Sequence, residues 1–116
     1  MEYSGNVRCI QGDLVQLWSQ IIWNSIQAVA SKGTIQIRSF KRSDTVFVEI
    51  EDSGVGIPQD NHAKIFMPFF STKTTGDGLG LGLYLVKEIA NRHNANVDFE
   101  STPGRTIFKV GFPLTT

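Results

Sequence analysis

The feature that most constrains this chain is a run of four glycines at every second position: Gly76, Gly78, Gly80 and Gly82. The run opens directly into an apolar, helix-forming stretch, and Lys73 stands just before it. Glycine lets the backbone approach a ligand closely, and a loop that ends as a helix N-terminus gathers unpaired N–H groups in one place. These groups and the helix dipole favour an anion. The run therefore predicts a polyphosphate-binding loop rather than a surface loop with incidental glycines.

Length and charge limit the chain to one small domain that binds anions locally. Its 116 residues fit a single domain over 1–116. Lys and Arg number 11 and Asp and Glu number 11, which argues against a broad charged surface for nucleic acid or an acidic membrane. No run approaches the ~18 apolar residues of a membrane span, and the first residues are unlike a signal peptide. We therefore expect a soluble, cytoplasmic domain with no nucleic-acid partner and no direct membrane contact.

Hydrophobic periodicity predicts helices alternating with hairpins. The expected elements are an edge strand over 6–10, a helix from Asp13 to about Ser31, strands 34–40 and 45–52 as a hairpin, a short helix over 58–66, the glycine loop, a helix from Leu81 to about His93, and strands 96–101 and 106–112 as a closing hairpin. This order implies the α/β (α+β) class, a two-layer sandwich in which helices cover one face of a mixed, mostly antiparallel sheet. It supports neither a P-loop nor a dinucleotide-binding fold.

Asn24 is a polar residue on the first expected helix that could bind a metal. Gln20, Asn24 and Ala28 follow one another at intervals of four, so they lie on one helix face. The amide oxygen of Asn24 could ligate a hard cation such as Mg²⁺ together with phosphate oxygens. A solvated polar face is the alternative, and the helix alone leaves both open.

Asp52 ends a strand on the face that Val46 and Ile50 occupy, so its carboxylate points toward the core. Burying it unpaired costs several kcal/mol, and the exocyclic amine of a nucleobase would supply a donor. Alternatively, Asp52 bonds its own turn, as Asp before Gly commonly does. In the turn that follows, Gly54 and Gly56 allow close approach of a flat ligand.

The remaining notable side chains are interpreted as structural. Phe66, Phe69 and Phe70 are expected to anchor the core or a loop rather than stack on a base. His62 is expected on the exposed side of the short helix. Cys9, the single cysteine, is expected to pack within the edge strand.

In their order, these motifs resemble the four boxes of the histidine-kinase catalytic and ATP-binding domain. The matching segments are the N box around Asn24, the G1 box over 52–57, the F box over 65–73 and the G2 box over 76–83. The segment around Thr106 is similar to the Gly-Thr-x-Phe ending of the family, although Arg105 interrupts it. The resemblance spans nearly the whole chain. It implies the Bergerat-type ATP-binding fold shared with gyrase, Hsp90 and mismatch-repair ATPases.

The resemblance also implies roles for individual residues. Asn24 and Lys73 would be the catalytic residues, with Asn24 binding Mg²⁺, and Asp52 would hydrogen-bond the adenine of ATP. The residues implied to line the rest of the nucleotide site are Gly54, Gly56, Ile57, Gly78, Gly80, Gly82, Leu83 and Thr106.

The function implied is that of a two-component sensor histidine kinase. The domain would position the γ-phosphate of ATP for transfer to a histidine on a separate dimerisation domain, expected in the same full-length protein, with a response regulator downstream. Neither His62 nor His93 is followed by the acidic residue that usually follows the family's acceptor. Gln20 stands where related ATPases carry Glu, and glutamine cannot take a proton at neutral pH. The alternatives are a regulatory nucleotide-binding module without turnover, and an ATPase or anti-sigma-type serine kinase of the same fold.

Overall fold

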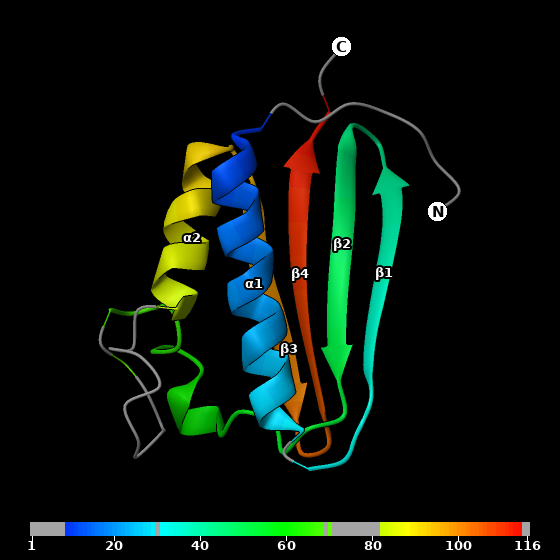
Figure 1. The fold of residues 1–116 in the computed structure, drawn as a ribbon, viewed down its shortest axis with the longest axis vertical. Helices are drawn as coiled ribbons and strands as arrows, with labels where there is room; N and C mark the ends of the chain where they lie inside the picture. The colour runs from blue at the N-terminus through cyan, green and yellow to red at the C-terminus, as the bar shows by residue number, and fades with distance from the viewer. Residues whose placement is uncertain (1–8, 30, 69, 71–81, 115–116) are drawn as a thin grey trace.

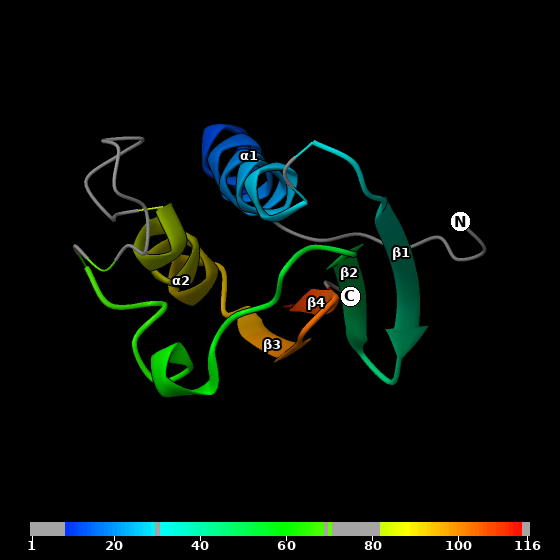
Figure 2. The same ribbon diagram turned by 90° about the horizontal axis from the view of Figure 1, so that it is seen from below.

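In the residues that the structure describes, the chain folds as two layers, a four-stranded sheet with two helices on one face (Figure 1). The computed structural model describes residues 9–29, 31–68, 70 and 82–114. Its elements are α1 (Gln11–Ala28), β1 (Ile35–Arg42), β2 (Thr45–Asp52), the short 3₁₀ helix η1 (Gln59–Asn61), α2 (Gly82–Arg92), β3 (Asn96–Thr102) and β4 (Arg105–Pro113). Seen from below, α2 lies on the β3 side of the sheet, and β1 lies out to the side beyond α1 (Figure 2). The predicted two-layer α+β sandwich is confirmed.

The strand order in the sheet is β1-β2-β4-β3. Within the described residues each of these pairings is antiparallel, so only the antiparallel part of the expected mixed sheet is seen. Both predicted hairpins are present. The register places Thr106 of β4 opposite Asp52 of β2 on one side and opposite Ser101 of β3 on the other.

Apolar side chains of both helices meet alternate residues of the central strands. Burying such a side chain stabilises the fold by roughly 1.5–3 kcal/mol relative to leaving it exposed. Six of the core side chains are 0% exposed: Leu17, Ile21, Val86, Ile89, Phe108 and Val110. Since they come from α1, α2 and β4, the core lies between the helix pair and the middle of the sheet. Among the described residues no helix is long and apolar enough to cross a membrane.

Polar contacts tie the start of α1 to the end of α2. His93 is 9% exposed; its Nε2 accepts the N–H of Ile10 at 3.0 Å, and its Nδ1 donates to the carbonyl of Ile89 at 2.9 Å. Nδ1 carries the proton because a carbonyl can only accept, which leaves Nε2 as the acceptor. An ion pair between Asp13 and Arg92, 3.2 Å long, joins the same two helix ends. The helices therefore run antiparallel with a fixed alignment.

The first helix begins earlier than predicted and is capped differently. α1 starts at Gln11 and ends at Ala28, and the residue before it, Ile10, makes no side-chain capping bond. Asp13, the predicted cap, lies inside the first turn, where its carboxylate pairs with Arg92. The backbone N–H of Ile10, just before the helix, is bonded by His93, which directly follows α2.

The edge strand expected over 6–10 is not found at residues 9 and 10, the part of it that the structure describes. Residues 6–8 lie outside the described residues, and Cys9 and Ile10 have no strand structure. Cys9 is exposed and Ile10 is 60% exposed. The packing role expected for Cys9 is therefore wrong, because this stretch leads into α1 instead of lying in the sheet.

The helix expected over 58–66 is reduced to η1, followed by turns. Backbone hydrogen bonds between residues three apart, such as that from the N–H of Asn61 to the carbonyl of Pro58 at 2.8 Å, hold this stretch together with side-chain contacts to the sheet. His62 is half-buried: its Nε2 donates to the carbonyl of Ile57 at 2.8 Å, and its ring meets Phe99 edge-on with centroids 5.0 Å apart. The expectation of an exposed His62 is wrong.

The aromatic residues that follow act as anchors, as predicted. The ring of Phe66 meets Phe99 and Phe108 edge-on, with centroids 5.9 and 6.4 Å away. Phe70 is partly buried and packs against the core. Phe69 lies outside the described residues.

The turn after β2 packs against the last turn of α1. The N–H of Val55 donates to the carbonyl of Ala28 at 3.2 Å. A Cβ at Gly54 would lie 2.5 Å from that same carbonyl oxygen, so this position has no room for a side chain. Gly54 therefore sets how closely the end of the sheet approaches the helix layer.

Replacing Gly54 should loosen this junction. Gly54→Ala should lower the free energy of unfolding by about 2–3 kcal/mol, because the methyl group would press on helix backbone that cannot move aside. Gly12→Ala is the control, since nothing lies within 4 Å of a Cβ there. It should raise stability by about 0.5 kcal/mol, as expected for Gly to Ala in a helix. Urea denaturation measures both; equal effects of the two substitutions would contradict the close packing at Gly54.

Candidate functional site

Several of the predicted site residues meet at one end of the sandwich. The C-terminal half of α1, the end of β2, the β3–β4 turn and the start of α2 lie toward the same end of the molecule (Figure 1). Asp52 is the last residue of β2, Thr106 is its partner on β4, and Gly82 is the first residue of α2. Segments far apart in the sequence thus contribute to one region.

Asp52 is buried with one oxygen bonded and the other free. Its side chain is 1% exposed, and Oδ1 accepts the N–H of Gly54 at 2.9 Å. Oδ2 has no hydrogen-bond partner among the described residues. Burial raises the pKa of Asp52; the Gly54 N–H and the nearby Ser25 hydroxyl oppose the rise, and the charge of Glu51 adds to it. The turn-forming interpretation of Asp52 is confirmed, and its second oxygen still lacks a donor.

A row of hydroxyls continues from Asp52 across the sheet. Thr106 is 2% exposed, and its Oγ1 shares a hydrogen bond with Ser101 Oγ at 2.7 Å. Ser101 Oγ also accepts the N–H of Ile57 at 2.7 Å, which fastens the turn after β2 to β3. The sequence analysis missed Ser101. The signal was available, since the closing hairpin places it directly opposite Thr106.

Backbone contacts hold the glycine turn on both sides. Gly56 has φ of 84°, which favours glycine, and a Cβ there would lie 2.5 Å from the carbonyl oxygen of Thr102. Gly54 meets Ala28 of α1 in the same way. The turn therefore runs between the end of α1 and the β3–β4 turn, with the backbone of both elements in direct contact with its glycines.

Gln20, Asn24 and Ala28 share one face of α1, and contacts of the first and the last of them show where this face lies. A Cβ at Gly82 would lie 2.6 Å from Gln20 Oε1, so Gln20 lies beside the start of α2. Ala28, at the other end, contacts Gly54. Asn24 is half-buried and lies between them on the same helix face. Its amide therefore occupies the helix surface between the turn after β2 and the start of α2.

The phosphate side of the predicted site is described only in part. Leu83 is half-buried and belongs to the first turn of α2, whose N–H groups lack intrahelical partners. Lys73, Gly78 and Gly80 lie outside the described residues. Among the residues that are described, no group of three or more His, Cys, Asp or Glu could hold a metal ion. A cation held here by Asn24 would need further oxygens from its ligand.

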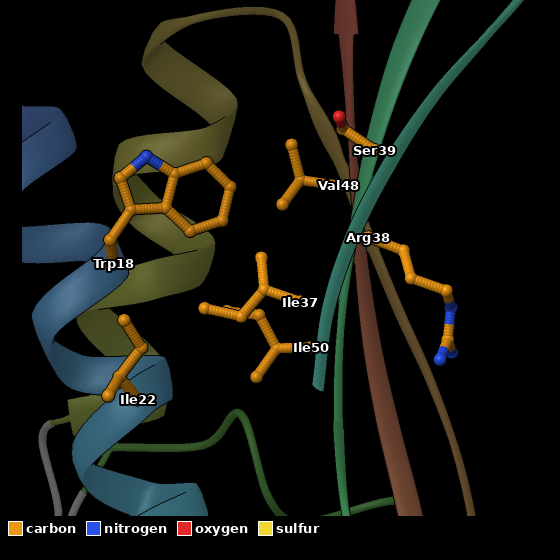
Figure 3. A pocket seen from close by; sticks show the side chains of 7 residues that line it. All are labelled: Trp18, Ile22, Ile37, Arg38, Ser39, Val48 and Ile50. Carbon is orange, nitrogen blue, oxygen red and sulfur yellow. The ribbon is translucent and has the colours of Figure 1, made fainter. Parts of the chain in front are cut away.

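A separate apolar cavity of about 440 Å³ lies between α1 and the strands β1 and β2 (Figure 3). Trp18 and Ile22 face it from the helix, and Ile37 and Ile50 are among the strand residues that face it. Arg38 points away, toward ion pairs with Glu49 and Glu51 on the opposite face of the sheet. None of the predicted site residues lines this cavity, so it is not the predicted nucleotide pocket.

Comparison with known proteins identifies the family. Residues 9–116 match the family described as histidine kinase-, DNA gyrase B-, and HSP90-like ATPase. The chain is 37% identical over 114 residues to the sensory histidine kinase/phosphatase NtrB of Rhodobacter capsulatus, covering 87% of this chain and 32% of that protein. It is 40% identical over 92 residues to the signal transduction histidine-protein kinase AtoS of Escherichia coli, covering 78% of this chain and 15% of that protein. The chain thus spans about a third or less of these relatives.

Solved structures agree with the sequence comparison. The fold is similar to the catalytic domain of histidine kinase ThkA, with a TM-score of 0.82 and 31% identity, covering 92% of this chain and 70% of that one. It is also similar in fold to full-length ShkA in complex with AMPPNP, with a TM-score of 0.84 and 23% identity, covering 97% of this chain and 24% of that one. This chain therefore belongs to the family of histidine kinase-, DNA gyrase B- and HSP90-like ATPases, and its similarities are to the sensor histidine kinases within it.

Proposed function

We propose that this chain is the catalytic domain of a two-component sensor histidine kinase, which positions Mg-ATP for γ-phosphoryl transfer to a histidine on a separate dimerisation domain. A response regulator would be the next acceptor. The observation that carries the proposal is the buried Asp52 oxygen that lacks a donor, at the strand end where the resemblance in sequence motifs implies adenine. Positioning and charge stabilisation account for most catalysis of phosphoryl transfer, so a domain that binds ATP and leaves the nucleophile to another domain suits this role.

The base would bind against the turn after β2. Its exocyclic amine would donate to Asp52 Oδ2, because the other carboxylate oxygen already holds the Gly54 N–H. Gly54 and Gly56 let this turn pack closely against Ala28 and Thr102, and Ile57 would supply an apolar contact to the ring. Thr106 would join the polar network on the adenine side. An amine donor would bond Asp52 Oδ2, the carboxylate oxygen that the described residues leave without a partner at this strand end.

The metal and the phosphates would bind between α1 and the start of α2. The Asn24 amide oxygen is a ligand that suits Mg²⁺, with phosphate oxygens and water completing its coordination. Bound Mg²⁺ would neutralise part of the triphosphate charge. The residues that we assign to the phosphates are Lys73, Gly78, Gly80, Gly82 and the backbone amide of Leu83. Asn24 is half-buried and lies on the same helix face as Gln20, which is beside Gly82. This position supports binding of Mg²⁺ and phosphates here.

The phosphate acceptor is proposed to lie outside this chain. Both ring nitrogens of His93 are engaged, by Ile10 and by Ile89, and the side chain is buried. His62 is half-buried, with Nε2 bonded to the Ile57 carbonyl. Gln20 lies beside Gly82, and it cannot accept a proton from water or from a serine hydroxyl. These contacts favour transfer to a separate histidine over self-contained hydrolysis.

Asn24→Ala should remove the magnesium dependence of nucleotide binding. Calorimetric titration of the 116-residue chain should show tighter ATP binding with Mg²⁺ than with EDTA, and this difference should vanish in the variant while binding in EDTA changes little. The exposed Gln16 of the same helix offers a control, since Gln16→Ala should keep the full magnesium effect. An intact magnesium effect in Asn24→Ala would refute the metal assignment.

Asp52→Asn should weaken ATP binding without lowering stability. The new amide would present N–H to the incoming amine, so affinity should fall by about 10- to 100-fold, the range for a hydrogen bond to a charged group. Because burial raises the pKa of Asp52, the charged carboxylate costs stability at neutral pH and the protonated form does not. The melting temperature of the variant should therefore equal or exceed that of the wild type at pH 7. This advantage should shrink as the pH falls into the carboxyl range.

The exposed Asp60 supplies the control for this experiment. Asp60→Asn should leave ATP affinity unchanged. If Asp52→Asn bound ATP as tightly as the wild type, Asp52 would not recognise the base.

The isolated chain should not phosphorylate itself. Incubation with γ-labelled ATP and Mg²⁺ should leave the 116-residue chain unlabelled, because both ring nitrogens of His93 and the Nε2 of His62 are already engaged and neither histidine precedes an acidic residue. A dimerisation domain from a similar kinase such as NtrB, added separately, should become labelled on histidine. Label on the isolated chain would contradict the proposal of an external acceptor.

A further inference from the structure

Ser25 is a buried hydroxyl whose bonding the fold does not explain. It is 0% exposed and lies on α1, on the buried side that also carries Leu17 and Ile21. Its Oγ has no hydrogen-bond partner among the described residues, so it does not bond even the carbonyl one turn earlier in the helix. Buried polar side chains are nearly always paired, and an unpaired one calls for a specific reason.

The second unpaired buried side-chain atom in the described part of the chain is Asp52 Oδ2, which lies on the neighbouring strand end near Ser25. The Ser25 hydroxyl is close enough to Asp52 to favour its charged form, although the two side chains do not meet the geometry of a hydrogen bond. One turn further along α1, Ala28 contacts Gly54 and accepts the N–H of Val55, just after Asp52. Helix and strand end are thus pressed together with two unsatisfied oxygens at the junction.

We propose that Ser25 is a second base-recognition residue, whose hydroxyl and Asp52 Oδ2 together receive the exocyclic amino group of a 6-aminopurine. The inference rests on the proposed function, because it places adenine against Asp52. It adds a residue from the helix layer to a base site otherwise built from the sheet and its turn.

The chemistry of an amino group matches these two atoms. An exocyclic amine carries two N–H donors, and the junction offers two unfilled acceptors, since Asp52 Oδ1 is already used by Gly54. A 6-oxopurine would instead bring an acceptor against the carboxylate, which can only accept when ionised. The pair would therefore select a purine with an amino group at this position, and a site that pairs a substrate N–H discriminates strongly against analogues that lack it.

The test compares two nucleotides by calorimetry with the 116-residue chain. ATP carries the amino group, and purine riboside triphosphate lacks it but is otherwise the same. Ser25→Ala should weaken binding of ATP by about 3- to 10-fold and leave binding of purine riboside triphosphate unchanged. Ser19→Ala is the control, because Ser19 is an exposed serine of the same helix, and it should alter neither affinity.

Stability and coupling separate recognition from a structural role. Ser25→Ala removes an unpaired buried oxygen and keeps Cβ, so its melting temperature should not fall. In an Asp52→Asn background, Ser25→Ala should have little further effect on ATP affinity, because both side chains serve one amino group.

The inference is overturned if Ser25→Ala binds ATP like the wild type, loses affinity equally for both nucleotides, or acts additively with Asp52→Asn. Any of these results, with a wild-type chain that binds ATP, would leave the proposed function standing. A wild-type chain that binds neither nucleotide would reject the proposed function and this inference together.

Discussion

The site depends on a carboxylate that the fold buries and only half satisfies. Asp52 gives one oxygen to the turn that follows it and leaves the other without a donor, in a position that solvent does not reach. Burial disfavours the charge, so the free protein carries a local destabilisation at neutral pH. A ligand with a suitable N–H removes that destabilisation when it binds. Part of the binding free energy then comes from pairing the buried Asp52 oxygen, in addition to the other contacts of the ligand.

The backbone around Asp52 makes this arrangement rigid. The turn after β2 is held by the end of α1 through Ala28 and by the β3–β4 turn through Thr102, and in both places a side chain would collide. Ser101 adds a hydrogen bond to Ile57 from a third strand. The turn that carries Gly54 and Gly56 is therefore held by main-chain contacts with elements that the core already fixes.

Regular periodicity made most of the fold predictable. Both hairpins, the end of α2 near Asn94 and the inward direction of Asp52 follow from spacings of two and of three to four residues. Contacts between distant segments were not predictable in this way: the sequence did not indicate that Ser25 lies beside Asp52, or that His93 holds the start of α1. Three-dimensional contacts also replaced the short helix after Pro58 with turns. The roles of Lys73, Gly78 and Gly80 came from the family resemblance and stay predictions.

The strand order has a consequence for how the domain is assembled. β4 is the last described strand in the sequence, yet it lies between β2 and β3 and supplies Thr106 opposite Asp52. During synthesis, the hairpin of β1 and β2 must wait for more than fifty further residues before its inner edge is covered. Such non-local pairing slows folding and leaves a strand edge open to wrong partners in the meantime. The end of the sheet that carries Asp52 is thus among the last parts of the nascent chain to be completed.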